Sequence, residues 1–473
     1  MGALEALAKI AGYLPTVERP RMRPSLYERL GWTALALIAY IVMANTFLYG
    51  IPTQGIQASP QILLLQVIFA SNRGTLMELG IGPIVTAGLI MQILAGAKMI
   101  EIDLSDPEDR KKFTAAQKSL AVILAAFEAS LYAVSCRYWY VVGGNPITGC
   151  TASAATRAVV ALQIFLGAYI AILLDEMIQK GWGIGSGVSL FILAGVAQTI
   201  FWDVFSPLYV QGTVIGLVPY MVQVNFNPAL FVIRPGGRDL VGLVATIAVS
   251  LLLVYLNNMR VEVPVTHPRI GSLKSKVPLQ FLYVSNIPVL FVGIIYADIL
   301  VFASFLRGAS GLLAGAASWL ASYDAQGRLV GGLAYYLSPP TGVYSVYAEP
   351  TRSVVYFLSL VGLSVVFGYL WVEVAGLNAA AQADQFARSG LVVPGMRSNP
   401  KVLEKLLDRY ITPLTGLSSL IIGVIAGFAD LLGVYGGGMG LLLAIGIVQQ
   451  YYMLIAYERA LEAYPALKRF LGE

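Results

Sequence analysis

Ten long apolar segments, spread over the whole chain, constrain its fold more than any other feature of the sequence. Each contains about 17 to 20 residues, which at 1.5 Å per residue is enough α-helix to cross the hydrocarbon core of a bilayer. Nine segments carry no charged residue, and the third is interrupted only by Glu128. They cover residues 30–49, 79–97, 119–136, 158–174, 186–202, 240–258, 278–297, 353–372, 411–429 and 438–457. We therefore predict an all-α polytopic membrane protein with ten transmembrane helices.

The composition excludes the main alternative classes. Only 12% of the 473 residues are charged, whereas about 25% is usual in a soluble domain, and 57% are hydrophobic. A soluble core of ordinary size cannot bury so much apolar surface, and a disordered chain would be far more polar. The formal net charge of +5 could indicate nucleic-acid binding, but in a membrane protein a basic excess more often sets the orientation of the chain.

The basic residues favour a chain with both ends in the cytosol. The first 29 residues are charged, contain three prolines and lack the pattern of a cleavable signal peptide. If the N-terminus lies inside, ten spans place 23 of the 31 Lys and Arg residues on the cytosolic side. Five spans per half would give the halves opposite orientations, so we expect two inverted five-helix halves.

The expected organisation follows from these spans. We predict a cytosolic N-terminal arm over residues 1–29, a first half over 30–205, an extracytoplasmic loop over 206–239, a second half over 240–457 and a cytosolic tail over 458–473. Basic cytosolic loops interrupt the second half at residues 257–277 and 376–410. The positive-inside rule alone accounts for some of this charge, while the length of the loops favours docking of a large anionic partner such as RNA.

Residues 60–74 do not fit the pattern of spans. The sequence PQILLLQVIFASNRG is apolar over about ten residues, too short to cross a bilayer and too apolar for an ordinary loop. It is either a re-entrant half-helix or an amphipathic helix in the outer leaflet, and its periodicity does not decide between the two.

Motifs of enzymes and cofactor sites are scarce. The sequence contains no GxxxxGK[ST] phosphate loop and no HExxH, and His267 has no Cys or second His near it in the sequence. The GIGSG sequence at residues 183–187 lacks the strand and spacing of a dinucleotide loop and indicates close helix packing or a hinge. We expect no metal and no cofactor. Cys136 and Cys150 fall in one predicted outer loop, where a disulfide and two free thiols are both possible.

Ionisable residues inside the spans are few. Glu128 is the deepest, and its carboxyl is either a proton carrier or a hydrogen-bonding partner of a polar residue on a neighbouring helix. A ten-span secondary transporter of a small solute is the alternative to a channel, although such a protein usually has more charge at the membrane midplane. Five other acidic residues are expected near span ends, within reach of water or headgroups: Asp175, Glu176, Asp298, Glu373 and Asp430.

Several stretches, taken in order, point to a known family. Residues 79–96 read LGIGPIVTAGLIMQILAG, and they follow FASNRGTL. Further on come DEMIQKGWGIGSGVSLFILAGVAQTIF, MRVEVPVTHPRIGSLKSK, YVSNIPVL, GLAYYLSPP, FGYLWVEVAGL and GGGMGLLL. Over essentially the whole chain these stretches resemble the SecY family, the central (alpha) subunit of the Sec protein-conducting channel. The IGPIVTAG wording is similar to the archaeal and eukaryotic branch.

The resemblance implies an hourglass pore between two pseudo-symmetric halves, with residues 60–74 as a re-entrant plug helix. The residues that match the family's plug are Leu64, Val67, Ile68 and Arg73. An apolar ring at the pore's constriction would consist of Ile81, Val85, Val188, Ile192, Leu290 and Leu443. The lateral gate would contain the polar residues Thr86, Gln92, Glu128 and Asn286.

The resemblance also implies a function and partners. The expected protein is a non-enzymatic channel that passes unfolded secretory polypeptides across the membrane and releases transmembrane segments through its lateral gate. Expected partners are SecE-like and SecG or beta-type small membrane subunits, the ribosome or another cytosolic partner, a nascent polypeptide with a signal sequence, and the lipid bilayer. We expect an archaeal plasma membrane rather than endoplasmic reticulum. Docking of the cytosolic partner is expected at Arg260, Arg269, Lys274, Lys276, Arg397 and Lys401.

Overall fold

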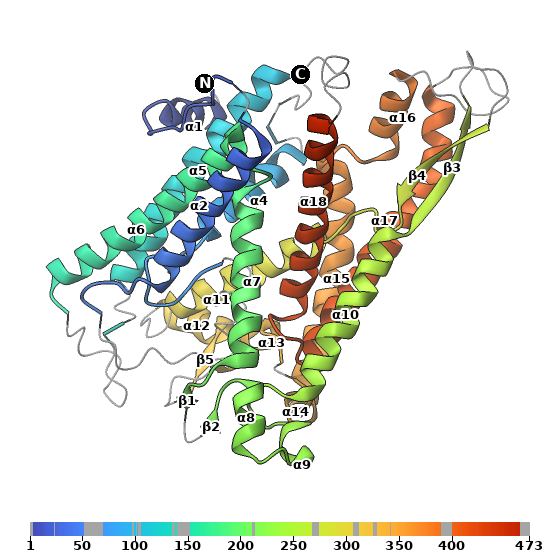
Figure 1. The fold of residues 1–473 in the computed structure, drawn as a ribbon. Helices are drawn as coiled ribbons and strands as arrows, with labels where there is room; N and C mark the ends of the chain where they lie inside the picture. The colour runs from blue at the N-terminus through green and yellow to red at the C-terminus, as the bar shows by residue number, and fades with distance from the viewer. Residues whose placement is uncertain are drawn as a thin grey trace.

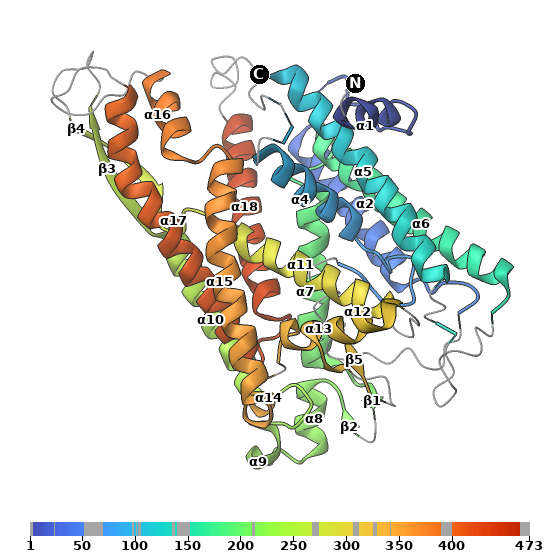
Figure 2. The same cartoon turned by 180° about the vertical axis from the view of Figure 1, so that it is seen from behind.

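The computed structural model describes most of the chain. It covers residues 3–22, 24–51, 70–96, 99–100, 102, 106–134, 138–139, 152–210, 213–266, 274–305, 312–324, 329–340, 342–388 and 400–463. Long helices dominate these ranges, and most of them run, with different tilts, between two ends of the molecule, whereas α11 lies across them (Figures 1 and 2). Residues Leu64, Val67, Ile68, Cys136, Cys150, His267, Arg269 and Arg397 lie outside the described residues.

Ten helices in the described part of the chain each overlap one predicted span. Seven of them are long and apolar enough to cross a membrane, α4 and α11 are shorter apolar helices, and α5 begins with a charged stretch. The ten are α2 (Leu26–Asn45), α4 (Gly82–Gly96), α5 (Pro107–Val134), α6 (Ala154–Met177), α7 (Gly187–Phe205), α10 (Leu240–Asn258), α11 (Ile287–Phe305), α15 (Pro350–Val374), α17 (Pro400–Leu431) and α18 (Gly438–Ala463).

Short helices and two-stranded hairpins occupy the ends of the bundle. The hairpins are antiparallel, and the longest pairs Arg260 with Gln280 at its base. The short helices are α1 (Ala3–Ala11), the π-helix η1 (Ile178–Trp182), α8 (Leu217–Gln223), α9 (Pro228–Phe231), α12 (Leu312–Leu320), α13 (Leu333–Leu337), α14 (Val343–Ala348) and α16 (Ala379–Arg388). The strands are β1 (Tyr209–Val210), β2 (Thr213–Val214), β3 (Arg260–Thr266), β4 (Lys274–Gln280), β5 (Ser322–Tyr323) and β6 (Leu329–Gly331).

The two ends of the bundle carry different elements. Helices α1 and α16 and the β3–β4 hairpin lie at the end where both chain termini are found, whereas α8, α9 and α14 lie at the other end (Figure 1). Seen from behind, α11 runs between the helices of the N-terminal half and those of the C-terminal half, and it contacts both α4 and α15 (Figure 2). The halves therefore meet along α4, α11 and α15, and also where α7 packs against α18.

Several helices differ from the predicted spans at their ends. The seventh segment was expected to begin at residue 278, but residues up to 280 belong to β4. The helix begins at Ile287, two residues after Ser285, whose φ is +54°, and one residue before Pro288. Proline suits the first turn of a helix because its missing N–H has no partner there. Helices α5 and α17 begin 12 and 11 residues before their apolar segments, at Pro107 and Pro400, because a helix can continue into water on charged residues.

Candidate functional site

Six aliphatic residues, on α7, α11 and α18 and at the start of α4, meet in one cluster. Ile81, Ile192 and Leu443 are 0%, 3% and 6% exposed and belong to one hydrophobic cluster. The partly buried side chains of Val85, Val188 and Leu290 pack against the same cluster. The structure thus brings together all six residues that the family resemblance selects for the pore ring, from both halves of the chain.

The spacing of these residues explains why they share one surface. Ile81 and Val85 are four residues apart at the start of α4, and Val188 and Ile192 are four apart at the start of α7. Residues at positions i and i+4 lie above one another on the same face of a helix. Each pair therefore directs two aliphatic side chains toward the same place, where Leu290 and Leu443 arrive from α11 and α18.

The start of α7 is held by a buried carboxylate. Asp175 on α6 is only 6% exposed, and its Oδ1 accepts the Val188 N–H at 2.9 Å while Gln179 donates to Oδ2 at 2.7 Å. A Cβ on Gly187 would lie 2.6 Å from the Asp175 Cα, so glycine is required at this close approach. The GIGSG sequence therefore serves close packing, one of its two predicted roles.

Asp175 and Asp430 were expected at span ends within reach of water, and for these two residues the prediction was wrong. Asp175 and Asp430 are each 6% exposed and satisfy the free N–H groups at the start of the next helix. Asp430 accepts the Gly438 N–H and the Tyr356 hydroxyl, each at 2.7 Å. An acidic residue that ends one span can thus be buried as a cap for the next, which apolar segment lengths do not reveal.

The chain that leaves the predicted plug is anchored beside the ring. Ala70 is fully buried in the ring cluster, and its carbonyl accepts the Tyr40 hydroxyl at 2.9 Å. Two residues later, the Asn72 side chain donates to the Ala44 carbonyl at 2.6 Å. Arg73, the only described residue among the four plug residues selected by resemblance, follows at a half-buried position. Helices α2 and α7 thus hold the C-terminal end of the segment next to the six aliphatic residues.

The four residues selected for the lateral gate belong to α4, to α5 and to the turn before α11, and we call the boundary between the halves along these elements the seam. Thr86 and Gln92 belong to α4, which packs against α5 on one side and contacts α11 and α15 on the other. Glu128 lies on α5. Asn286 precedes α11, is 6% exposed and donates its side-chain amide to the Leu442 carbonyl of α18 at 2.6 Å.

The carboxyl of Asp298, which was expected near a span end, belongs to this seam. Asp298 interacts electrostatically with Glu128 and lies within reach of the Thr86 side chain. Because α11 runs to Phe305, Asp298 lies inside the helix, about 18 Å along its axis from Asn286. The polar groups of the seam therefore form two sites, one around Asp298 and one at Asn286. The Asn-Ile-Pro sequence at the start of α11 was the signal that could have placed Asp298 correctly.

The elements that carry the described residues selected for partner docking, β3, β4 and α17, reach the end of the bundle where α1 and α16 lie (Figure 1). Arg260 is exposed at the base of the β3–β4 hairpin, and Lys401 is exposed in the first turn of α17. The backbones of Lys274 and Lys276 belong to β4. In Figures 1 and 2 the start of α17 lies between α16 and the β3–β4 hairpin, so these three elements are neighbours at this end of the bundle.

Comparisons with known proteins agree with this architecture. The SecY family model matches residues 75–452, and the model described as the plug domain of Sec61p matches residues 38–74. The protein translocase subunit SecY of Aeropyrum pernix is 50% identical over 100% of this chain and 99% of its own length. The corresponding subunit of Saccharolobus solfataricus is 44% identical, with all of both chains covered.

Solved structures give the same result. A structure described as a protein conducting channel matches 97% of this chain and 98% of its own, with a TM-score of 0.77 and 36% identity. Sec61 in the canine ribosome-channel complex from the endoplasmic reticulum matches the same shares, with a TM-score of 0.75 and 35% identity. The predicted ten-helix membrane fold is confirmed, and the alternative of a solute transporter gains no support. This chain belongs to the SecY family.

Proposed function

We propose that this protein is the channel-forming subunit of a Sec translocon, which passes unfolded secretory polypeptides across the membrane and releases transmembrane segments sideways. The observation that carries the proposal is the meeting of six aliphatic side chains from α4, α7, α11 and α18 in one cluster. A narrow waist of such side chains excludes water and ions by dewetting, yet offers a passing polypeptide no polar group to bind. The role requires no chemical step from the protein itself.

The plug and the gate complete the proposed mechanism. Residues 60–74 act as the plug, and the anchoring of Ala70 beside the ring supports its position next to the waist. Gate opening separates α4 and α5 from α11 and α15. Polar contacts between membrane helices contribute around 1 kcal/mol each, so a hydrophobic signal sequence that enters the seam can compete with those at Thr86, Glu128 and Asn286.

We further propose that the N- and C-termini face the cytosol of an archaeal cell, with 23 of the 31 Lys and Arg residues on that side. Both termini lie at the same end of the bundle as α16 and the β3–β4 hairpin, and this supports the orientation (Figure 1). Arg260, Arg269, Lys274, Lys276, Arg397 and Lys401 would then dock the ribosome or another partner. SecE-like and SecG or beta-type subunits would complete the complex, and the domain boundaries stay as predicted from the sequence.

Photocrosslinking of a translocating chain tests the proposal directly. A photoreactive amino acid is placed at Leu443, at Ile81 or, as a control, at Ile170, whose side chain is 41% exposed on α6. A stalled secretory polypeptide in reconstituted vesicles is expected to crosslink to the first two positions and not to the third. Equal crosslinking at all three positions, or crosslinking at Ile170 alone, would show that polypeptides do not pass through the ring.

A further inference from the structure

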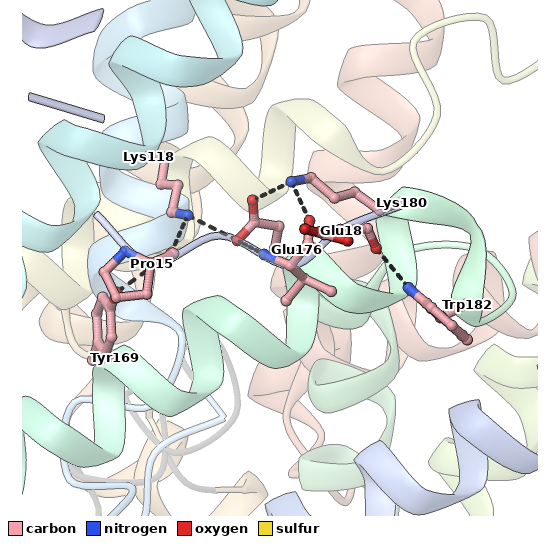
Figure 3. Close-up of polar contacts among 8 residues, drawn as sticks. Pro15, Glu18, Lys118, Tyr169, Glu176, Lys180 and Trp182 are labelled. Atoms are coloured by element: carbon pink, nitrogen blue, oxygen red, sulfur yellow. Dashed lines mark hydrogen bonds and ion pairs between the residues drawn. The ribbon is translucent and has the colours of Figure 1, made fainter. Parts of the chain in front are cut away.

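A short N-terminal segment, residues 15–18, lies across α5 at Lys118 and across the end of α6, and it is held mainly through its backbone (Figure 3). Lys118 on α5 donates to the Pro15 carbonyl at 2.9 Å. Lys180 and Trp182, both on η1 at the end of α6, donate to the carbonyls of Val17 and Glu18, the latter at 2.7 Å. We call residues 15–18 the strap.

Glu176 lies at the centre of these contacts. Its carboxylate pairs with Lys118 and with Lys180, each at 2.8 Å, and accepts the Val17 N–H at 3.5 Å. The Lys118 and Glu176 side chains are only 12% and 14% exposed. Partly buried ion pairs are screened by water and salt much less than exposed ones. One carboxylate on α6 thus joins α5, η1 and the strap.

Further contacts connect the strap to the rest of this end of the bundle. The amphipathic helix α1, which precedes the strap, packs Leu4 and Leu7 against Met91 of α4 and Phe113 of α5. The chain that follows the strap enters α2, where Arg29 donates to the Gly183 carbonyl at 3.0 Å. The N-terminal arm therefore contacts both helices that form one side of the gate seam, α4 and α5, and holds α5 to α6.

We propose that the strap, positioned by Glu176, makes α5 and α6 move as one body and thereby sets how hydrophobic a signal segment must be to open the lateral gate. This inference rests on the proposed function. Removing the Glu176 charge leaves two lysines facing each other without their shared partner, and unpaired charges in a partly buried site are unfavourable. Helix α5 then separates from α6 more readily, and opening of the seam needs less interaction energy from the signal segment.

Two measurements on the intact complex in lipid nanodiscs and vesicles test the strap. The first is the distance distribution between spin labels at Thr114 on α5 and Ile170 on α6, both exposed. The distribution is expected to widen in Glu176→Gln and in Lys118→Gln. The second is translocation of a reporter with a weakened signal sequence, expected to rise about fivefold in both variants, as a change near 1 kcal/mol would produce.

Matched variants separate the strap from a general loss of structure. Lys112→Gln removes the same charge from the same helix, but Lys112 is 52% exposed and pairs only locally with Asp109, so it is expected to behave as wild type. Lys118→Arg keeps the ion pair and is expected to restore wild-type behaviour. If Glu176→Gln does not fold, Trp182→Phe provides a second test. It removes the indole N–H that donates to the strap but keeps an aromatic ring next to Trp32, and it is expected to shift both measurements in the same direction.

The outcomes also distinguish this inference from the proposed function. If neither the distances nor the weak-signal reporter changes in Glu176→Gln and Lys118→Gln while strong signals still support translocation, the strap proposal is overturned and the channel proposal stands. If the label distances widen but the signal requirement does not move, the strap has a structural role only and the proposal also fails. If the wild-type complex does not translocate a reporter with a strong signal, the proposed function itself fails.

Discussion

Arg238 forms an ion pair with Asp203, with 2.8 Å between Nη2 and Oδ2, and the two side chains are only 15% and 12% exposed. Asp203 belongs to the last turn of α7, in the first half of the chain, and Arg238 lies two residues before α10, in the loop that leads into the second half. The Arg238 guanidinium also lies 5.5 Å from the centroid of the Tyr435 ring, in the turn between α17 and α18. The connection between the halves is therefore fastened by a largely desolvated charge pair.

Breaking this pair is expected to destabilise the protein. Asp203→Asn leaves the Arg238 charge without its partner, at a cost of about 3 kcal/mol in the free energy of unfolding. Replacing both residues together, by Asp203→Leu and Arg238→Met, is expected to cost less than the single change because no charge is left alone. Unfolding of the purified complex in detergent, followed as a double-mutant cycle, measures both values. A double variant that is as unstable as Asp203→Asn, or less stable, would contradict the assignment.

Substitution of the aliphatic ring is expected to open a path for ions while translocation continues. Ile81→Ser combined with Ile192→Ser places hydroxyls at the waist, which then binds water. Conductance across planar bilayers should rise above the wild-type baseline. Leu166→Ser, on α6 with 45% exposure and outside the ring, is the control and should leave conductance unchanged. An unchanged conductance in the ring variant would remove these residues from the constriction.

The ten helices were predictable because crossing a bilayer requires about 20 apolar residues, and few other structures need such segments. The ends of the helices were not. Apolar content marks only the part inside the membrane, whereas α17 continues on charged residues to Pro400. Before α11, apolar residues continue back along the chain into β4. Only the backbone conformation at Ser285 and the proline that follows it define where the helix starts.

The pore ring could not be derived from hydrophobic periodicity. In α4 and α7 nearly every residue is apolar, so Ile81 and Ile192 look the same in sequence as neighbours that face lipid. The family resemblance selected them, and the fold brings them together. The strap was not predictable for a different reason: its acceptors are backbone carbonyls, which carry no sequence signal, and its donors lie more than 100 residues away along the chain.

Acidification is expected to weaken the contact between Glu349 and Arg352 at the start of α15. Partial burial alone would raise the pKa of Glu349, but hydrogen bonds from Arg352 and Tyr335 lower it below its ordinary value of 4.5. The charged form therefore stabilises the fold above pH 4.5, and this contribution is lost as the pH falls through the lowered pKa.

The expected size is below about 1 kcal/mol, because the Glu349 side chain is 43% exposed. The difference in melting temperature between pH 7 and pH 3.5 is expected to be smaller in Glu349→Gln than in wild type. An equal or larger difference in the variant would show that the carboxylate does not contribute.

The carboxyl of Asp298 is expected to oppose opening of the lateral gate. In this structure it lies near Glu128 and Thr86, and movement of α11 away from α4 and α5 would remove this polar environment and expose the group to lipid. Asp298→Leu is therefore expected to let less hydrophobic signal sequences enter, with a shift of around 1 kcal/mol in the gate equilibrium. Translocation of reporters with graded signal hydrophobicity measures the shift. Phe302→Leu, at a 50% exposed position on the same helix, is the control and should leave translocation of the graded reporters unchanged. A requirement for more hydrophobic signals in Asp298→Leu would contradict the proposed opposition of Asp298 to gate opening.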